Sequence, residues 1–272
     1  LRPQQWLKNL LMFVALLTSL SFGRATAWLQ SGLAFAAFCL VASGIYIVND
    51  LLDLRADRAH PRKRQRPFAA GQLSPQTGML MSIVLVVAGL GLGALLPWPT
   101  LPWLAGYLIL TLLYSLVLKT YVVMDVVVLA GLYTLRVVVG AAAIEVPISF
   151  WLLAFSVFMF FSLALVKRCA ELNLMAAVQQ EATHGRDYRV ADEFTLRALG
   201  IASGIASIAV FALYINAPEN LARFGSPQVL WLVCPLLLYW IARMWIKTSR
   251  DEMHDDPLIF TLRDRGSRVV VA

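Results

Sequence analysis

Charged residues and cysteine are both scarce in this sequence. Only 14% of the 272 residues are Asp, Glu, Lys or Arg, whereas 60% are hydrophobic, and the mean hydropathy is +0.72. Soluble domains are only about half apolar, so we predict an integral membrane protein. The three cysteines, Cys39, Cys169 and Cys234, have no paired spacing and fall in or beside apolar runs. We therefore expect packing roles for them, and neither disulfides nor zinc sites.

Several enzyme signatures are also missing. The chain contains no HExxH, GxSxG or CxxC pattern, so hydrolase and redox chemistry have no support. The stretch GLGLGA (89–94) superficially resembles a dinucleotide fingerprint, but it lies within an apolar run with no preceding strand. We interpret its glycines as sites of close helix packing.

Apolar runs long enough to cross a membrane recur along the chain. A hydrocarbon core of about 30 Å requires about 20 helical residues. Such runs are predicted near residues 8–23, 28–48, 76–96, 101–118, 122–144, 148–166, 195–216 and 228–246, and a ninth begins near Leu258 and is cut off at Ala272. The predicted fold class is all-α: a polytopic membrane helical bundle of nine transmembrane helices, the ninth truncated, around a cytoplasm-facing cavity.

The basic residues predict the orientation in the bilayer. With the amino terminus inside, 20 of the 23 Lys and Arg fall in inner segments, the outer loops hold only Arg24 and Arg223, and Arg136 lies within a span. This pattern obeys the positive-inside rule and predicts a cytoplasmic-membrane protein whose active site faces the cytoplasm. Orientation and attraction to anionic lipids explain the net charge of +7, so no nucleic-acid partner is expected.

Acidic residues cluster at the end of the second predicted span. If that helix continues through Asp57, then Tyr46, Asn49, Asp53 and Asp57 form a stripe on one face, with Asp50 at its edge. Carboxylates placed so close together repel one another, and a cation would relieve this cost. Hard oxygen ligands suit Mg²⁺, which also binds substrate phosphates. We predict a magnesium site formed by Asn49, Asp50, Asp53 and Asp57, with the three aspartates catalytic.

A compact basic segment follows these acids. His60-Pro61 is expected to stop the helix, and the bases after it are Arg62, Lys63, Arg64 and Arg66. Acids for Mg²⁺ beside bases for phosphate oxygens are what a diphosphate leaving group needs. The alternative is that acids and bases only neutralise each other in a solvated loop. The helical register of the acids argues against that alternative.

NDLLDLRAD (49–57) matches NDxxDxxxD, the first aspartate-rich motif of the UbiA superfamily of intramembrane prenyltransferases, and the resemblance covers essentially the whole chain. It is closest to the branch that includes decaprenyl-phosphate phosphoribosyltransferase, through RPQQWLKN (2–9), DRAHPRKRQRPFAAG (57–71), YSLVLK (114–119), LAGLYTLRVVVGA (129–141) and KRCAEL (167–172). The resemblance implies one transmembrane domain over residues 1–272. It also implies Mg²⁺-dependent transfer of 5-phosphoribose from phosphoribosyl pyrophosphate to a polyprenyl phosphate lipid.

The chain opens on Leu1 without a Met. Some relatives with a similar opening segment carry a soluble hydrolase-like domain before it. We therefore expect this chain to be part of a longer protein, with a fused or associated domain of that kind.

One departure from the superfamily bears on the acceptor. Aromatic prenyltransferases of the superfamily carry a second aspartate-rich motif after the sixth span, where this chain has Lys167, Arg168 and Glu171. Bases there favour an anionic acceptor such as a lipid phosphate, although they could be ordinary flanking anchors. Aromatic prenylation with a polyprenyl diphosphate is the alternative reaction. A transporter is a third, disfavoured because we find no internal repeat and the charged clusters lie on one side.

Other polar residues are candidates for substrate contacts. By resemblance, Lys119 contacts diphosphate and Tyr114 lines the same cavity, although Lys119 could equally be a flanking lysine that snorkels. Asp125 and Arg136 lie eleven residues apart in the fifth predicted span and so share a helix face. Ionisable groups at that depth normally face a cavity or a partner, and we predict cavity lining over a purely structural pairing.

The loop QQEATHGRDYRVAD (179–192) is long enough to cover a cytoplasmic cavity. Its Arg186 and Tyr188 either close over the ribose phosphate or are simply solvated. The full predicted substrate-binding set is Lys8, Tyr46, Arg62, Lys63, Arg64, Arg66, Tyr114, Lys119, Asp125, Arg136, Lys167, Arg168, Glu171, Arg186 and Tyr188.

Overall fold

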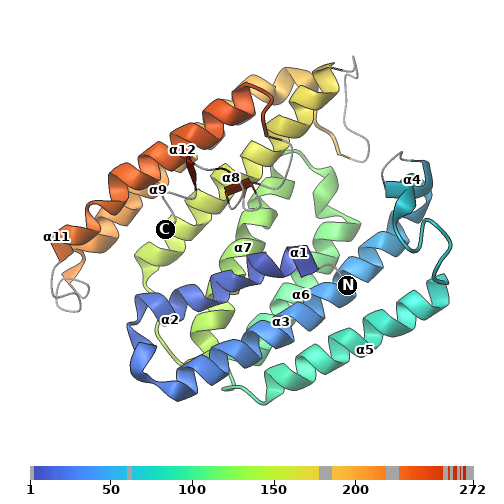
Figure 1. The fold of residues 1–272 in the computed structure, drawn as a ribbon, viewed down its shortest axis with the longest axis horizontal. Helices are drawn as coiled ribbons and strands as arrows, with labels where there is room; N and C mark the ends of the chain where they lie inside the picture. The colour runs from blue at the N-terminus through green and yellow to red at the C-terminus, as the bar shows by residue number, and fades with distance from the viewer. Residues whose placement is uncertain are drawn as a thin grey trace. The chain divides into compact units, whose positions relative to one another are not determined.

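The computed structural model of the chain describes residues 3–59, 63–177, 186–218 and 227–253, together with Pro257, Phe260, Thr261, Asp264, Gly266 and Ser267. Helices are the only regular elements in these residues (Figure 1). The chain forms two compact units, one from Leu1–Leu116 and Leu135–Ile148 and the other from Val117–Thr134 and Ser149–Ala272. Below they are called unit 1 and unit 2.

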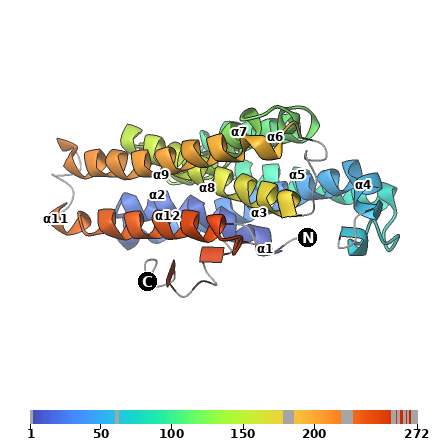
Figure 2. The same cartoon turned by 90° about the horizontal axis from the view of Figure 1, so that it is seen from above.

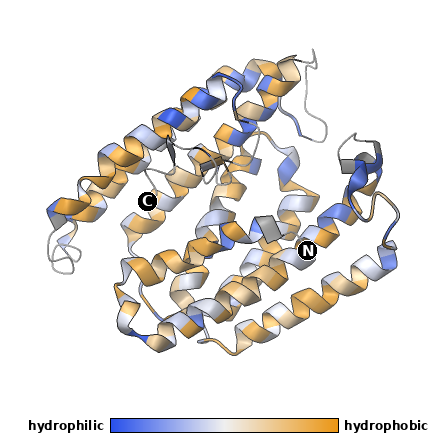
Figure 3. Cartoon of the chain, viewed as in Figure 1, coloured by the Kyte–Doolittle hydropathy of each residue, from blue (hydrophilic) through white to orange (hydrophobic). Residues whose placement is uncertain are grey.

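Six helical segments are long and apolar enough to cross a membrane. They are α3 (Ala25–Leu52), α5 (Pro75–Ala94), α7 (Met124–Ala143), α8 (Phe150–Ala177), the segment Val190–Asn216 that includes α9 (Glu193–Asn216), and the segment Gln228–Ser249 that includes α12 (Val233–Ser249). Shorter apolar helices occupy Leu7–Thr18 and α6 (Thr100–Leu116). Hydrophobic residues dominate these helices, whereas hydrophilic ones gather at α4 (Leu54–Ala59) (Figure 3).

These eight apolar helical segments overlap the first eight predicted spans. The helical membrane character predicted from composition is therefore confirmed, with six helices of sufficient length among the described residues rather than nine. The ninth predicted span begins near Leu258, and only a few residues of that region are among those described.

In unit 1, α3 and α5 lie side by side (Figures 1 and 2). A Cβ on Gly44 of α3 would lie 2.7 Å from Val86 Cγ2, and one on Gly89 of α5 would lie 2.8 Å from the carbonyl oxygen of Ala37. Both approaches are closer than real side chains tolerate. The interpretation of GLGLGA as a packing segment is confirmed at Gly89, whereas a Cβ on Gly91 would meet open space.

The first apolar segment is not one regular α-helix. It consists of α1 (Pro3–Trp6), the 3₁₀ helix η1 (Leu7–Phe13) and α2 (Val14–Thr18), followed by η2 (Ser21–Gly23). A 3₁₀ run of seven residues is unusually long. Beside it, a Cβ on Gly140 of α7 would overlap the carbonyl group of Met12. Glycine at 140 therefore lets α7 pass directly against the backbone of η1.

In unit 2, α8 packs along α9, and α12 contacts both helices. Ser162 of α8 donates a hydrogen bond of 2.7 Å to the carbonyl of Gly200 and accepts one of 3.2 Å from the indole of Trp245. These contacts tie α8 to α9 and to α12 through one buried hydroxyl. The remaining short elements are η3 (Lys63–Gln65), η4 (Leu118–Thr120), η5 (Val190–Asp192) and α11 (Pro227–Leu230).

Candidate functional site

The predicted aspartate stripe lies where α3 passes into α4. The helix was predicted to continue through Asp57, but α3 ends at Leu52 and α4 begins at Leu54, with Asp53 between them at φ −88° and ψ 8°. The backbone N–H of Asp53 still donates to the carbonyl of Asn49 (3.0 Å), and that of Asp57 donates to the carbonyl of Asp53 (2.8 Å). The helical hydrogen-bond spacing of the stripe is thus kept across the interruption.

Arg66 joins two of the predicted metal ligands. Its Nη1 lies 3.2 Å from Asp50 Oδ1 and 2.6 Å from Asp57 Oδ2. Asp57 is only 2% exposed. The guanidinium compensates charge that would otherwise be costly to bury, because an unpaired carboxylate loses its hydration there. Two carboxylates of the predicted metal site thus contact one guanidinium.

The donor chemistry at this end of α3 fits Mg²⁺. The amide oxygen of Asn49 is buried and accepts no hydrogen bond from the described part of the chain. It stands beside carboxylates, and such hard oxygen donors are the ligands that Mg²⁺ prefers. Within the described residues, however, no group of three or more His, Cys, Asp or Glu side chains is arranged to hold a metal. A bound ion would therefore need oxygen atoms from Asn49, water or substrate as well.

A cavity of about 160 Å³ adjoins Asp50 and Arg66 in unit 1. Its other lining residues are Ser43, Tyr46, Ile47, Pro67, Phe68, Leu73 and Met81. Tyr46, predicted as a substrate contact, thus shares a cavity with an aspartate and an arginine of the predicted site. The mostly apolar wall contributed by Pro67, Phe68, Leu73 and Met81 was not predicted from sequence, because these residues carry no chemical motif.

Arg136 forms a second buried polar cluster in unit 1. Its Nε donates to Asn9 Oδ1 at 3.0 Å, Nη2 donates to the Tyr107 hydroxyl at 3.4 Å, and its guanidinium lies 5.1 Å from the centre of the Phe38 ring. Lys8 is likewise buried. Asn9 and Tyr107 accept hydrogen bonds from the guanidinium through an amide oxygen and a hydroxyl, and the Phe38 ring lies against it. Asn9 and Tyr107 were missed because neither belongs to a charged motif.

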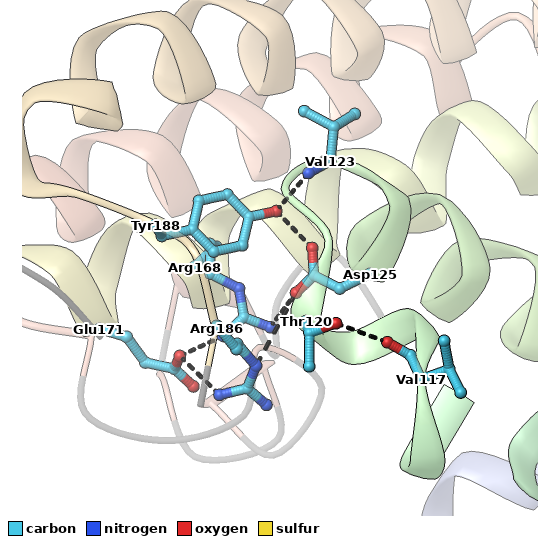
Figure 4. A network of polar contacts seen from close by, with 8 residues as sticks. All are labelled: Val117, Thr120, Val123, Asp125, Arg168, Glu171, Arg186 and Tyr188. Carbon is cyan, nitrogen blue, oxygen red and sulfur yellow. Dashed lines mark hydrogen bonds and ion pairs between the residues drawn. The ribbon is translucent and has the colours of Figure 1, made fainter. Parts of the chain in front are cut away.

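A network of charged residues lies in unit 2 (Figure 4). Arg168 of α8 is 1% exposed, and its Nη2 lies 2.8 Å from Oδ2 of the fully buried Asp125, while Nη1 bonds Glu171. Arg186 approaches the same two carboxylates, at 3.9 Å from Asp125 and 3.7 Å from Glu171. Two arginines therefore face two carboxylates, so the charges of this group balance.

Tyr188 completes the network. Its side chain is fully buried, its hydroxyl donates to Asp125 Oδ1 and accepts the backbone N–H of Val123 at 2.9 Å, and the Arg168 guanidinium lies 5.4 Å from its ring centre. Burial, together with the hydrogen bond to Asp125, raises the pKa of Tyr188. The hydroxyl therefore stays protonated at neutral pH. Of the two alternatives for this residue, solvation is excluded by its burial.

Neighbouring predicted residues differ in their environments. Lys167 is exposed although Arg168 is buried, because adjacent helical residues point about 100° apart. Tyr114 and Lys119 are half-buried, and Arg64 is exposed.

Asp125 and Arg136, the two predicted cavity residues of α7, have separate sets of partners. Asp125 pairs with Arg168, whereas Arg136 bonds Asn9 and Tyr107. Arg62 and the side chain of Lys63 lie outside the described residues.

Residues 10–260 match the model of the UbiA prenyltransferase family. The chain is 38% identical to protein y4nM of Sinorhizobium fredii across 98% of this chain and 52% of that protein, so it spans about half the length of that relative. It is 37% identical to nodulation protein NoeC of Azorhizobium caulinodans across 99% of this chain and 88% of that protein.

It is also 30% identical to decaprenyl-phosphate phosphoribosyltransferase of Mycolicibacterium smegmatis, across 99% of this chain and 86% of that protein. Among solved structures, a UbiA homolog from Archaeoglobus fulgidus bound to GPP and Mg²⁺ superposes with a TM-score of 0.75 at 17% identity, covering 99% of this chain and 94% of that one. At such low identity this likeness shows a shared fold.

Proposed function

The chain belongs to the UbiA prenyltransferase family, and from this premise we propose that it transfers 5-phosphoribose from phosphoribosyl pyrophosphate to a polyprenyl phosphate. Membership confirms the resemblance inferred from NDLLDLRAD and makes the chain a transferase, so a transport function is set aside. The observation that carries the proposal is the pairing of Asp50 and Asp57 through Arg66 at the end of α3. The similarity to decaprenyl-phosphate phosphoribosyltransferase supports phosphoribose as the transferred group.

The aspartate end of α3 would bind the donor. Asn49, Asp50, Asp53 and Asp57 would hold Mg²⁺, which when bound stabilises negative charge on a departing diphosphate. Arg66 orients the carboxylates of Asp50 and Asp57, because it contacts both. Arg64, together with Arg62, Lys63 and Lys119 as predicted from sequence, would offset the phosphate charge.

The acceptor needs no general base, because a lipid phosphate is already ionised at neutral pH. One of its oxygens would attack C1 of the ribose, the C1–O bond to diphosphate would break, and the diphosphate would leave with the bonding electrons. Both Lys167 and Arg168 were predicted to steady the lipid phosphate. The buried Arg168 is already paired with Asp125 and Glu171, which favours Lys167 for that contact and gives Arg168 a positioning role.

The remaining parts of the proposal concern location and partners. The excess of Lys and Arg on one side favours a cytoplasmic membrane location with the site open to the cytoplasm, where a water-soluble sugar diphosphate is accessible. Three further points stay predictions: the nine spans, the binding of Mg²⁺, and a soluble hydrolase-like domain fused to or associated with this one. No nucleic acid takes part in the proposed reaction.

The test is a direct assay of both candidate reactions. Membranes containing the chain would be given radiolabelled phosphoribosyl pyrophosphate, Mg²⁺ and polyprenyl phosphates of several lengths, and lipid-linked phosphoribose would be extracted and counted. We expect product from the wild type and about a hundredfold less from Asp57→Asn, because that variant loses one charged metal ligand. The matched control is Glu252→Gln, which removes an exposed carboxylate outside the site.

The competing assay supplies a polyprenyl diphosphate and 4-hydroxybenzoate. If only that pair gives product, and the phosphoribosyl pair gives none at any lipid length tried, the proposed activity becomes aromatic prenylation. Near-normal turnover of Asp57→Asn would show that the aspartate stripe is not the catalytic metal site.

A further inference from the structure

The segment that joins α6 to α7 ends in a strained residue. Val123, directly before α7, has φ of +65°. A β-branched residue is rarely found in this left-handed region, because its side chain crowds the backbone there. Such a conformation persists only where the surrounding contacts hold it. Val123 is also the residue whose carbonyl accepts the first helical hydrogen bond of α7, from the N–H of Val127 at 3.0 Å.

Residues 187 and 188 supply contacts that hold this segment. The backbone N–H of Asp187 donates to the carbonyl of Thr120 at 3.3 Å. The Tyr188 hydroxyl accepts the N–H of Val123 at 2.9 Å and donates its own proton to Asp125 in the first turn of α7 (Figure 4). Tyr188 therefore caps the start of α7 from a distant part of the sequence. The same hydroxyl thus forms hydrogen bonds with the backbone of the strained Val123 and with the buried carboxylate of Asp125.

Lys119 lies in the same segment, in the 3₁₀ turn η4. The position of its ammonium group depends on the backbone path between that turn and α7. Resting on the proposed function, we infer that Tyr188 is a positioning residue for donor binding: its hydroxyl holds Val123 at positive φ and so fixes the backbone path that places Lys119, the lysine predicted from sequence to contact the diphosphate. Tyr188 itself touches neither substrate in this inference. Tyr188 thus acts on donor binding through the placement of Lys119 rather than through a contact to the ribose phosphate.

Tyr188→Phe is the informative variant. It keeps the ring beneath Arg168 but removes both hydrogen bonds of the hydroxyl, leaving the N–H of Val123 without its acceptor. We expect faster hydrogen exchange in peptides covering residues 117–127. We also expect a roughly five- to thirtyfold higher KM for phosphoribosyl pyrophosphate, the range for losing hydrogen bonds of this kind. Turnover and the KM for the lipid phosphate should change little.

A second variant tests the role of strain. Glycine adopts a positive φ without steric cost, so adding Val123→Gly to Tyr188→Phe should restore much of the lost donor affinity. A purely structural role for Tyr188 would lower stability and raise both KM values without such rescue. Tyr121→Phe is the matched control, because it removes an exposed tyrosine hydroxyl in the same segment and should leave exchange and both KM values unchanged.

The exchange measurement is independent of the reaction. Unchanged exchange of residues 117–127 in Tyr188→Phe would overturn the inference even if phosphoribose transfer is observed. Faster exchange with an unchanged donor KM would overturn it as well. If the wild type transfers no phosphoribose, the proposed function fails; faster exchange of residues 117–127 in Tyr188→Phe but not in Tyr121→Phe would still support the positioning of this segment by Tyr188.

Discussion

Lys167 and Arg168 have the same charge and adjacent positions, yet their surroundings in the structure differ. Lys167 is exposed, whereas Arg168 is 1% exposed and bonds Asp125 and Glu171. Sequence could predict that bases occur at the end of α8, because charge is visible in the letters. It could not predict which base is buried, because that depends on Asp125 and Tyr188, which are distant in the chain.

We expect the two residues to respond differently to the same substitution. Arg168→Gln should lower the free energy of unfolding by about 3 kcal/mol, because it removes the nearer charged partner of the buried Asp125 carboxylate and leaves the more distant Arg186, at 3.9 Å. Lys167→Gln should change stability by less than about 0.5 kcal/mol, as is usual for exposed sites. Denaturant or thermal unfolding in detergent measures both changes in stability. Because Lys167→Gln should fold normally, its KM for the polyprenyl phosphate then tests the proposed contact of Lys167 with the acceptor. Equal stability of the two variants would contradict the assigned burial of Arg168.

At the scale of helices, the positions of the apolar helices could be predicted from sequence, whereas the local irregularities within them could not. Run length predicted where the apolar helices lie, because a membrane span needs uninterrupted hydrophobic residues. The break at Asp53 and the 3₁₀ helix η1 were not predictable in this way. Both depend on hydrogen bonds and close contacts between elements. The contact of Arg66 with Asp50 and Asp57 likewise depends on how the chain turns back after α4.

The α3–α5 contact provides a test with an internal control. Gly89→Ala should destabilise the protein by roughly 1 to 3 kcal/mol, because its new methyl group would press on the backbone of α3 near Ala37. Gly91→Ala makes the same chemical change two residues away in α5, where a Cβ meets nothing within 4 Å. It should be neutral or slightly stabilising, since alanine favours a helix over glycine. Thermal unfolding of the two variants side by side decides the matter, and similar losses in both would refute close packing at Gly89.

At the scale of the whole molecule, hydrophobic helices carry the fold while charge sets its orientation. Family membership and six sufficiently long apolar helices establish an integral membrane protein. The direction of insertion rests on the distribution of Lys and Arg, which determines which ends of the spans are retained in the cytoplasm. The aspartate end of α3 is predicted to lie on the side rich in these bases, so the orientation of the protein decides whether a soluble donor can reach it.

Cysteine labelling answers that question directly. Pro99, in the turn between α5 and α6, is predicted to face outward, and Gln72, between η3 and α5, is predicted to face the cytoplasm; both are exposed. With a membrane-impermeant maleimide on intact spheroplasts, we expect Pro99→Cys to be labelled at once and Gln72→Cys only after permeabilisation. The unchanged protein is the blank, because Cys39, Cys169 and Cys234 are buried. The reverse pattern would place Asp50, Asp57 and Arg66 outside the cell, where a cytoplasmic phosphoribosyl donor could not reach them, and the proposed donor would have to be abandoned.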